Sequence, residues 1–238
     1  MAILKNIIVK ILDTSFGRRL VLLYLSRNKE ICINFLQASD RFSLQEVNVG
    51  KAASIRGFED LSFLFSSSKA NRGAIRLNFD EAAYLFTLVK SIRACKILEI
   101  GRFEGGSTIL FASAGDDQSK VTSIDKAPKN DTHLKKLLIQ WKLNKKVELI
   151  IADANDVDIS ENEYDIVFID GGHAYSSASK DYHHWKNSLK LGGHMIFHDC
   201  DNSEPGVVKV CNEILNNDSN IFEEWAQTSS LKDFVRID

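Results

Sequence analysis

The sequence predicts an α/β protein with a mostly parallel sheet that is covered by helices on both faces. Short apolar runs without polar alternation, such as KILEI (96–100) and YDIVFID (164–170), are typical of strands buried on both faces. Segments with helical spacing separate these runs, as in a doubly wound sheet. The closing FEEWAQTSSLKDFVRI (222–237) reads as two runs around a polar turn. A hairpin there would add one antiparallel strand.

The elements follow one another regularly from residue 78 onward. The helix predicted at 79–93 has an acidic first turn, and Leu85, Phe86, Val89 and Ile92 recur on one face. The glycine-rich turn after the first strand opens a further helix at Ser107. The remaining predicted strands are 121–125, 147–153, 164–170 and 194–199, and the remaining helices are 131–144, the segment around 181–190, and 205–215.

The chain before residue 78 differs in character. Residues 1–77 lack the strand and helix rhythm, so we expect an N-terminal helical appendage or cap on a main domain at 78–238. The first 30 residues contain more basic than acidic side chains. The basic ones are Lys5, Lys10, Arg18, Arg19, Arg27 and Lys29, and the acidic ones are Asp13 and Glu30. A cap with a solvated basic face is the favoured interpretation, and weak contact with an anionic membrane surface is the alternative.

Composition excludes several classes of function. The 238 residues are 44% hydrophobic and 26% charged, with a formal net charge of -2, so no basic footprint for nucleic acid is present. Four scattered cysteines without a CxxC pair indicate reduced thiols in a cytoplasmic protein. No apolar run approaches a membrane span of roughly 20 residues, and nothing indicates export. Whether the chain forms a homo-oligomer stays open.

Five consecutive predicted strands end in an acidic residue or run straight into one. These residues are Glu99, Asp125, Asp153, Asp170 and Asp199. A single carboxylate at a strand end is often a helix cap, but five in succession are not explained in that way. Because ligands of open α/β sheets bind beyond the carboxyl ends of the strands, these residues predict the binding site.

The glycine-rich turn in ILEIGRFEGGST (97–108) predicts a nucleoside ligand. Gly101 and Gly105 allow a tight turn close to a ligand, and Ser107 opens a helix whose free N–H groups attract an anion. Asp125 ends the next strand, where it can accept two ribose hydroxyls. The glycines do not match G-x-G-x-x-G, and Glu99 would repel a pyrophosphate but can hold an ammonium group. S-adenosylmethionine therefore suits the turn better than a dinucleotide.

An ordered series of motifs resembles the class I S-adenosylmethionine-dependent methyltransferases. The series is EIGRFEGGST, SID, VFIDGGHAY, LGGHMIFHD and EPGV, and it resembles in particular the small O-methyltransferase-like group with a D-G-x-H segment after strand four. The resemblance implies a seven-stranded, Rossmann-like sheet with an antiparallel last strand. It also implies site roles: Glu99, Gly101 and Ser107 around the methionine part, Asp125 at the ribose, Asp153 and Ala154 at the adenine edge, and Asp170 beside the methyl group. Gly105 is a further predicted cofactor-binding residue.

Two histidines are candidates for the base that removes a proton from a hydroxyl acceptor. His173 follows Asp170 by three residues, so the carboxylate can orient its ring. His198 is the second candidate, next to Asp199 at the end of strand five. With Asp170, these histidines form the predicted catalytic set.

The resemblance to methyltransferases of the catechol type implies a magnesium ion on Asp170 and Asp199. Hard cations such as magnesium are coordinated by several oxygen ligands. Cys200 stands where those enzymes carry an asparagine or a second acid, which leaves Asp201 or Asn202 to supply a third ligand.

The predicted function is O-methylation of a hydroxyl on a sugar or small natural product. An NAD(P)-dependent short-chain-type oxidoreductase is one alternative, because Tyr182-xxx-Lys186 imitates the tyrosine and lysine pair of those enzymes. The glycine turn of such enzymes normally opens the chain, and their tyrosine follows strand five, which argues against this alternative. A methyltransferase-like module that binds without catalysis is the other alternative.

Overall fold

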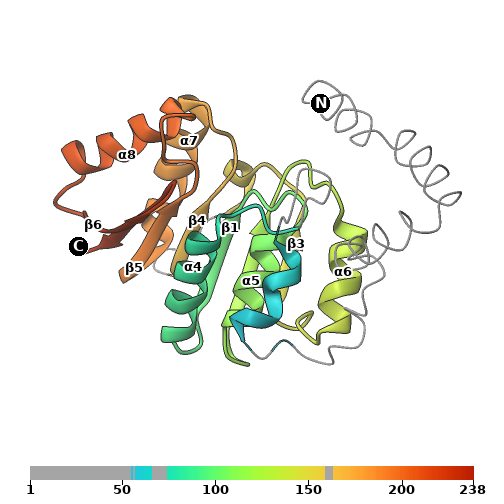
Figure 1. Cartoon of the computed structure of the whole chain (residues 1–238). Helices are drawn as coiled ribbons and strands as arrows, with labels where there is room; N and C mark the ends of the chain where they lie inside the picture. The colour runs from blue at the N-terminus through green and yellow to red at the C-terminus, as the bar shows by residue number, and fades with distance from the viewer. Residues whose placement is uncertain (1–54, 56, 66–73, 159–162) are drawn as a thin grey trace, which may run out of the picture.

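A seven-stranded sheet forms the centre of the computed structural model, which describes residues 55, 57–65, 74–158 and 163–238 (Figure 1). The strand order is β3-β2-β1-β4-β5-β7-β6. The first five strands are parallel, and β7 is antiparallel to both of its neighbours. The strands are β1 Lys96–Ile100, β2 Lys120–Ile124, β3 Val147–Ile150, β4 Tyr164–Ile169, β5 Leu189–Phe197, β6 Phe222–Thr228 and β7 Leu231–Arg236. The predicted doubly wound fold with its closing hairpin is confirmed.

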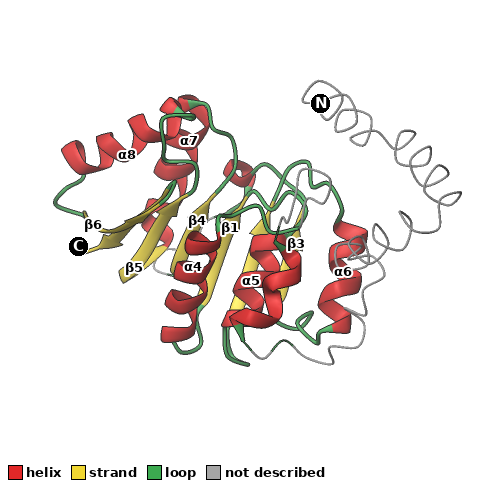
Figure 2. Cartoon of the chain, viewed as in Figure 1, coloured by secondary structure: helices red, strands yellow, loops and turns green. Residues whose placement is uncertain are grey.

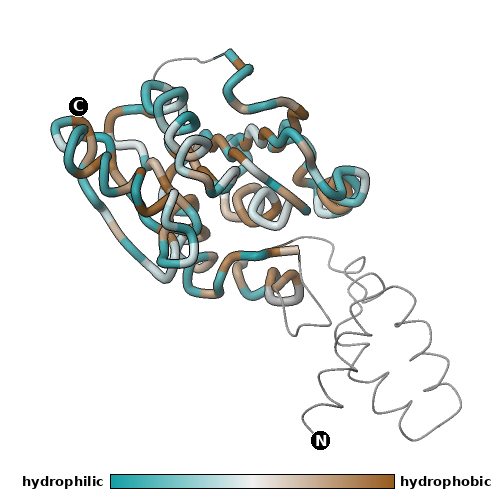
Figure 3. The backbone as a smooth tube through the Cα atoms, turned by 90° about the horizontal axis from the view of Figure 1, so that it is seen from above, coloured by the Kyte–Doolittle hydropathy of each residue, from teal (hydrophilic) through white to brown (hydrophobic). Residues whose placement is uncertain are grey.

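Helices cover both faces of this sheet (Figures 1 and 2). The α-helices are α4 Phe79–Ser91, α5 Gly106–Ala114, α6 Asp131–Gln140, α7 Tyr175–Trp185 and α8 Pro205–Asn217. Short 3₁₀ helices lie at η1 Phe58–Leu64, η2 Ala154–Asp156 and η3 Lys186–Ser188. One hydrophobic core joins α4, α5 and α6 to the sheet, and a second joins α7 and α8 to its other face. Figure 3 shows the same arrangement from above.

Alternation along the strands divides the apolar side chains between these two cores. On β1, Ile97 packs into the α4 and α5 core, whereas Leu98 and Ile100 pack into the α7 and α8 core. All three side chains are almost completely buried. A strand that is apolar at successive positions is therefore stable only between two helical layers, which is the pattern that the sequence predicts.

One predicted helix is too long. The segment at 181–190 was expected to be helical, but α7 ends at Trp185 and Leu189 already belongs to β5. The turn η3 separates them, and within it the Ser188 hydroxyl donates to the Trp185 carbonyl at 2.7 Å. Leu189 is fully buried, and a buried leucine is expected both in a helix and in a strand. Apolar spacing alone therefore could not place the boundary between them.

The strand order reverses between β1 and β4, and this reversal positions the site. From β1 the chain proceeds outward through β2 to β3, and it then returns to β4 on the other side of β1. The loops after β1 and β4 therefore diverge to opposite faces and leave a crevice at the carboxyl ends of the strands.

Most of the predicted N-terminal appendage lies outside the described residues. This includes the basic residues at positions 5–29, for which both alternatives stay open. Within the described part, Leu61, Leu64, Ile75 and Leu77 are buried in the core that α4 and α5 form. The boundary at residue 77 stays a prediction. No helix within the described ranges combines the length and the apolar character that crossing a membrane requires.

Candidate active site

A cavity of about 810 Å³ opens at the carboxyl ends of the strands. Its walls come from the glycine turn, the ends of β2, β3, β4 and β5, the start of α7, and the segment before α4. Nine of the predicted site residues line it: Gly101, Ser107, Asp125, Asp153, Ala154, Asp170, His173, His198 and Asp199. The structure thus brings together residues that lie as far as 98 positions apart in the sequence.

The glycine turn passes close beneath this cavity. Gly101 has φ +86°, and a Cβ there would lie 2.1 Å from the Asp170 carbonyl oxygen. Gly105 has φ +83° and is the N-cap of α5. Both positions require glycine because the left-handed region disfavours other residues, and at Gly101 the neighbouring strand leaves no room for a side chain.

Glu99 lies beneath the cavity wall and is not among the residues that line it. Its carboxylate is fully buried and accepts hydrogen bonds from the hydroxyls of Ser107, Thr108 and Ser123, each at 2.5 Å. Burial raises the pKa of Glu99 to about 7, although the three hydroxyls oppose the shift. Glu99 therefore fixes Ser107 from below.

Asp125 connects the end of β2 to the glycine turn. Its Oδ2 accepts from the backbone N–H groups of Arg102 at 3.0 Å and Phe103 at 2.9 Å, and its Oδ1 accepts from Ala127 at 2.7 Å. A carboxylate has about four acceptor positions, so these three hydrogen bonds leave about one of them for the cavity. The turn and the β2 end are thereby held as one unit.

At the end of β3, Asp153 caps η2. Its side chain accepts from the Asn155 backbone N–H at 3.0 Å and from the Asn155 amide at 3.1 Å. These hydrogen bonds lower the pKa of Asp153. Asn155 also donates to Asp181 on α7 at 2.7 Å, which links this wall of the cavity to the next helix.

His198 is surrounded by three carboxylates. Its Nδ1 lies 3.2 Å from Asp170 Oδ1 and 3.2 Å from Asp199 Oδ2, and its Nε2 lies 3.2 Å from Glu81 Oε2. Burial alone would lower the pKa of His198, but hydrogen bonds to Asp170, Asp199 and Glu81 outweigh it and raise the pKa far above the ordinary range. The three carboxylates therefore favour the imidazolium form of His198, and an imidazolium cannot accept a further proton.

His173 is more open and lies at the start of the segment that leads into α7. Its Nε2 is 3.0 Å from Asp199 Oδ2, and its Nδ1 is 3.3 Å from Glu204 Oε1. Asp170, His173 and Asp199 each offer one ligand atom, and these three atoms lie within 4.8 Å of one another. This group can either move a proton or hold a cation.

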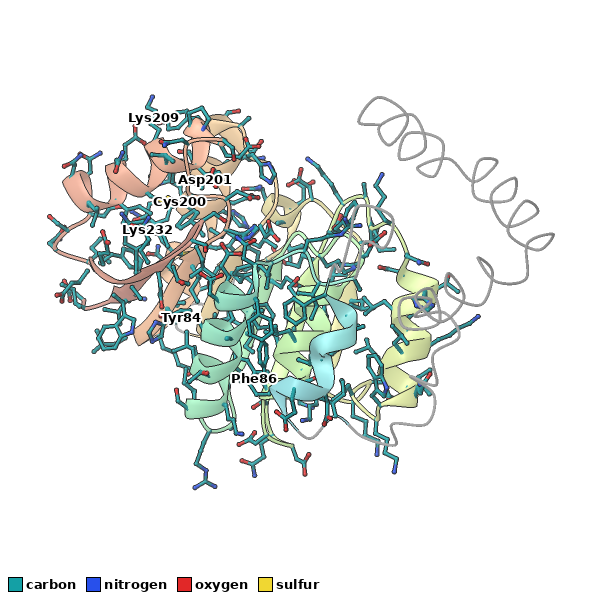
Figure 4. The ribbon with its side chains drawn as sticks, viewed as in Figure 1. Tyr84, Phe86, Cys200, Asp201, Lys209 and Lys232 are labelled. Atoms are coloured by element: carbon teal, nitrogen blue, oxygen red, sulfur yellow. The ribbon has the colours of Figure 1, made fainter. Side chains whose placement is uncertain are left out.

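Asp201 and Asn202, the two residues considered as a third metal ligand, follow Cys200 on the loop after β5, where Figure 4 labels Cys200 and Asp201. Asp201 is exposed and accepts from the Ser203 backbone at 2.8 Å and from the Ser203 hydroxyl at 2.5 Å. Asn202 does not line the cavity, and neither residue belongs to the three-residue group. His173 is the third potential ligand instead.

Sequence reasoning missed two residues that shape this site. Glu81, in the first turn of α4, is fully buried and accepts from the Ser230 backbone and hydroxyl as well as from His198. Arg102 is also buried and forms a bidentate pair with Asp131 at 2.9 and 2.7 Å. An acidic residue three positions after Asn78 is a helix-capping signal, so Glu81 gave no separate indication of a site.

The tyrosine and lysine pair that imitates a dehydrogenase lies away from the cavity. The Tyr182 hydroxyl donates to Asp218 at 2.5 Å, and Lys186 Nζ lies 3.1 Å from the same carboxylate. Neither residue lines the cavity. This removes the main sequence argument for the oxidoreductase alternative.

Comparison with known proteins agrees with this geometry. The family model described as "Methyltransferase domain" matches residues 98–200. A catechol O-methyltransferase from Mycobacterium tuberculosis is 28% identical over 135 residues, which are 56% of this chain and 60% of that protein. The chain therefore spans about 60% of the length of this curated relative.

Solved structures show the same fold. The cofactor-bound Rv0187 from MTB superposes with a TM-score of 0.60 at 17% identity, over 81% of this chain and 88% of that chain. A SAM-dependent O-methyltransferase from Thermotoga maritima gives a TM-score of 0.55 at 15% identity, over 70% and 68% of the two chains. The chain therefore shares the fold of this solved O-methyltransferase. In this methyltransferase fold, the cavity occupies the crevice at the strand-order reversal, where the sequence predicts the cofactor.

Proposed function

We propose that the protein transfers a methyl group from S-adenosylmethionine to a hydroxyl of a small molecule, either a sugar or a natural product. The observation that carries this proposal is the convergence of the glycine turn, Asp125 and Asp170 on one cavity. Such a site offers carboxylates for ribose hydroxyls and for cationic groups, and it offers no phosphate-binding G-x-G-x-x-G turn.

Each part of the cofactor has a partner of suitable chemistry. Asp125 lines the cavity at the end of β2 and would accept a hydrogen bond from the ribose hydroxyls at its remaining acceptor position. Asp153 and Ala154, at the end of β3, would hold the adenine edge. Gly101 and Ser107 would hold the methionine part, with Glu99 acting through the Ser107 hydroxyl that it binds. Gly105 does not line the cavity and would act by shaping the turn as the N-cap of α5.

S-adenosylmethionine supplies a methyl carbon that its sulfonium already activates. The acceptor oxygen forms the new bond to carbon, the carbon–sulfur bond electrons stay on sulfur, and the hydroxyl proton must leave. The protein therefore has to align the acceptor and receive or release that proton. Asp170 and His173 lie together at the end of β4 for this task.

Between the two predicted bases, the surroundings favour His173. His198 lies within 3.2 Å of three carboxylates that favour its protonated form, whereas His173 is half-exposed and lines the cavity. Asp199 lies 3.0 Å from His173 Nε2 and can orient the ring. We assign proton removal to His173 and a positioning role to His198.

A divalent cation fits the same group of residues. Asp170 and Asp199 would hold magnesium, with His173 as the neighbouring nitrogen donor, because their ligand atoms lie within 4.8 Å of one another. A bound cation would lower the pKa of an acceptor hydroxyl. Magnesium prefers oxygen ligands and waters, so two carboxylates make a workable magnesium site.

Calorimetry tests the cofactor assignment. S-adenosylhomocysteine should bind with a 1:1 stoichiometry, and NAD and NADP should give no heat of binding. Binding of NADP without S-adenosylhomocysteine would restore the oxidoreductase alternative. Binding of S-adenosylhomocysteine without methyl transfer to any hydroxyl acceptor of a broad panel would support the non-catalytic module.

A second experiment separates the base from the cation once an acceptor is found. If His173 removes the proton, His173→Ala should lower turnover by roughly 10²- to 10⁴-fold and leave cofactor affinity nearly intact. If Asp170 and Asp199 hold a required cation, a chelator should abolish activity and added Mg²⁺ should restore it. Activity that survives both treatments would contradict both roles.

A further inference from the structure

Arg76 contributes a positive charge to the cavity from a segment that the sequence assigns to the appendage. It lies two residues before the α4 N-cap Asn78 and lines the cavity together with Ala74 and Leu77. The neighbouring Ile75 is buried, and its N–H donates to the Leu64 carbonyl at 2.9 Å. Arg76 is therefore anchored on a fixed stretch of backbone.

This stretch lies directly against the start of α5. A Cβ on Gly106 would be 2.2 Å from the Ala74 carbonyl oxygen and 2.6 Å from Ile75 Cα. The absence of a side chain at Gly106 thus allows the two backbones to touch. Arg76 follows immediately and is held beside the first turn of the helix.

The guanidinium of Arg76 lies over the glycine turn. One of its nitrogens is 3.0 Å from Glu104 Oε2, and its central carbon is 5.4 Å from the centroid of the Phe103 ring. A guanidinium has five N–H donors in a planar fork, and this contact uses one of them. About 37% of the side chain is exposed, so the remaining donors can reach a ligand.

The other arginine and lysine side chains of the cavity wall have different surroundings from Arg76. Arg102 is buried in its bidentate pair with Asp131. Lys126 Nζ lies 3.9 Å from Asp153 at the end of β3, and Lys180 lies on α7. Among the described residues, Arg76 is therefore the cavity-lining cation whose contacts are with the glycine turn.

We propose that Arg76 binds the α-carboxylate of the methionine part of S-adenosylmethionine. This inference rests on the proposed function and deepens it. The ligand carries one anionic group, at its methionine end, and the glycine turn is the part of the cavity where that end would lie. Arginine binds carboxylates through two parallel N–H donors, and the free N–H groups at the start of α5 favour negative charge at the same place. Glu104 holds the guanidinium in this position.

A pair of ligands tests the proposal in the full-length protein. S-adenosylhomocysteine contains the carboxylate, whereas 5′-methylthioadenosine has the same nucleoside and sulfur but lacks the amino-acid group. By calorimetry, Arg76→Ala should weaken S-adenosylhomocysteine binding by about 10- to 100-fold, since a hydrogen bond to a charged group is typically worth about that factor. The affinity for 5′-methylthioadenosine, measured by displacement where it is weak, should stay unchanged.

Two further variants serve as controls. Arg76→Lys keeps the positive charge but lacks the planar pair of N–H donors. It should weaken the affinity for S-adenosylhomocysteine less than Arg76→Ala does, and it should leave the affinity for 5′-methylthioadenosine unchanged. Lys126→Ala removes a cavity cation from the loop after β2 and should leave the ratio of the two affinities unchanged. Thermal unfolding of each variant shows whether it is folded.

The outcomes separate this proposal from the proposed function. If the wild type binds both ligands and Arg76→Ala weakens both equally or neither, the carboxylate assignment is overturned and the cofactor site stands. If the wild type binds neither ligand, the result contradicts the proposed function and also the assignment of Arg76 to the carboxylate. A loss confined to S-adenosylhomocysteine supports both.

Discussion

At the residue scale, the Asp125 carboxylate that we propose for the ribose also holds the glycine turn through the Arg102 and Phe103 N–H groups. Asp125→Ala removes both and should weaken S-adenosylhomocysteine binding by at least about tenfold, since hydrogen bonds to charged groups contribute about 1.5 to 3 kcal/mol. Calorimetry measures the affinity.

Asp125→Asn is the matched control for this prediction. Asparagine keeps one acceptor oxygen for the turn, so the variant should fold like the wild type and lose less affinity than the alanine variant. Unchanged affinity in a folded Asp125→Ala protein would show that the ribose lies elsewhere.

Glu99 should make stability depend on pH. Burial raises its pKa in the folded protein to about 7, from 4.5. Between these values the unfolded chain has released the proton that the folded protein still holds, so the stability contributed by Glu99 falls as pH rises through this window. Compared with Glu99→Gln, the wild type should lose on the order of 2 kcal/mol between pH 4.5 and pH 8.

Urea unfolding of both proteins at several pH values measures this difference. All other titrating groups are common to the two chains, so their contributions cancel to a first approximation. A stability difference that is constant across the range would contradict the raised pKa.

At the scale of elements, the contact between the start of α5 and the segment before α4 depends on Gly106. Alanine is the better helix former, but its Cβ would meet the Ala74 carbonyl oxygen. Gly106→Ala should therefore destabilise the protein by about 1 to 3 kcal/mol, as other overpacked sites do. Denaturant unfolding measures the change.

Gly171→Ala is the matched control for this contact. Its Cβ would lie 3.4 Å from Asp181 Oδ2 and 3.5 Å from Ile100 Cγ2, which is ordinary van der Waals contact. We expect a change within about 0.5 kcal/mol. If the two variants were equally stable, the close approach at Gly106 would be refuted.

The sequence predicts the elements well where one physical signal dominates. Strands such as 96–100 and 164–170 are apolar at successive positions, which only a sheet covered on both faces accommodates. The boundary between α7 and β5 was missed because a buried leucine such as Leu189 fits the apolar pattern of a helix as well as that of a strand. Apolar spacing reports burial, and it does not report where a helix stops.

At the scale of the whole molecule, the strand ends could be predicted as a site because topology brings them together. The residues that support the strand ends from other elements could not be predicted from the sequence. Glu81 reaches His198 across 117 positions, and Arg76 reaches the glycine turn across 28. Neither pair leaves a local pattern, since a capping glutamate and a surface arginine have the same sequence signature without a site.

The structure of the protein with bound S-adenosylhomocysteine tests the central claim most directly. We expect the ribose hydroxyls at Asp125, the adenine beside Asp153 and Ala154, and the sulfur directed toward Asp170 and His173. The carboxylate should lie at Arg76. A nucleoside bound outside this cavity, or a sulfur directed away from Asp170 and His173, would contradict the account.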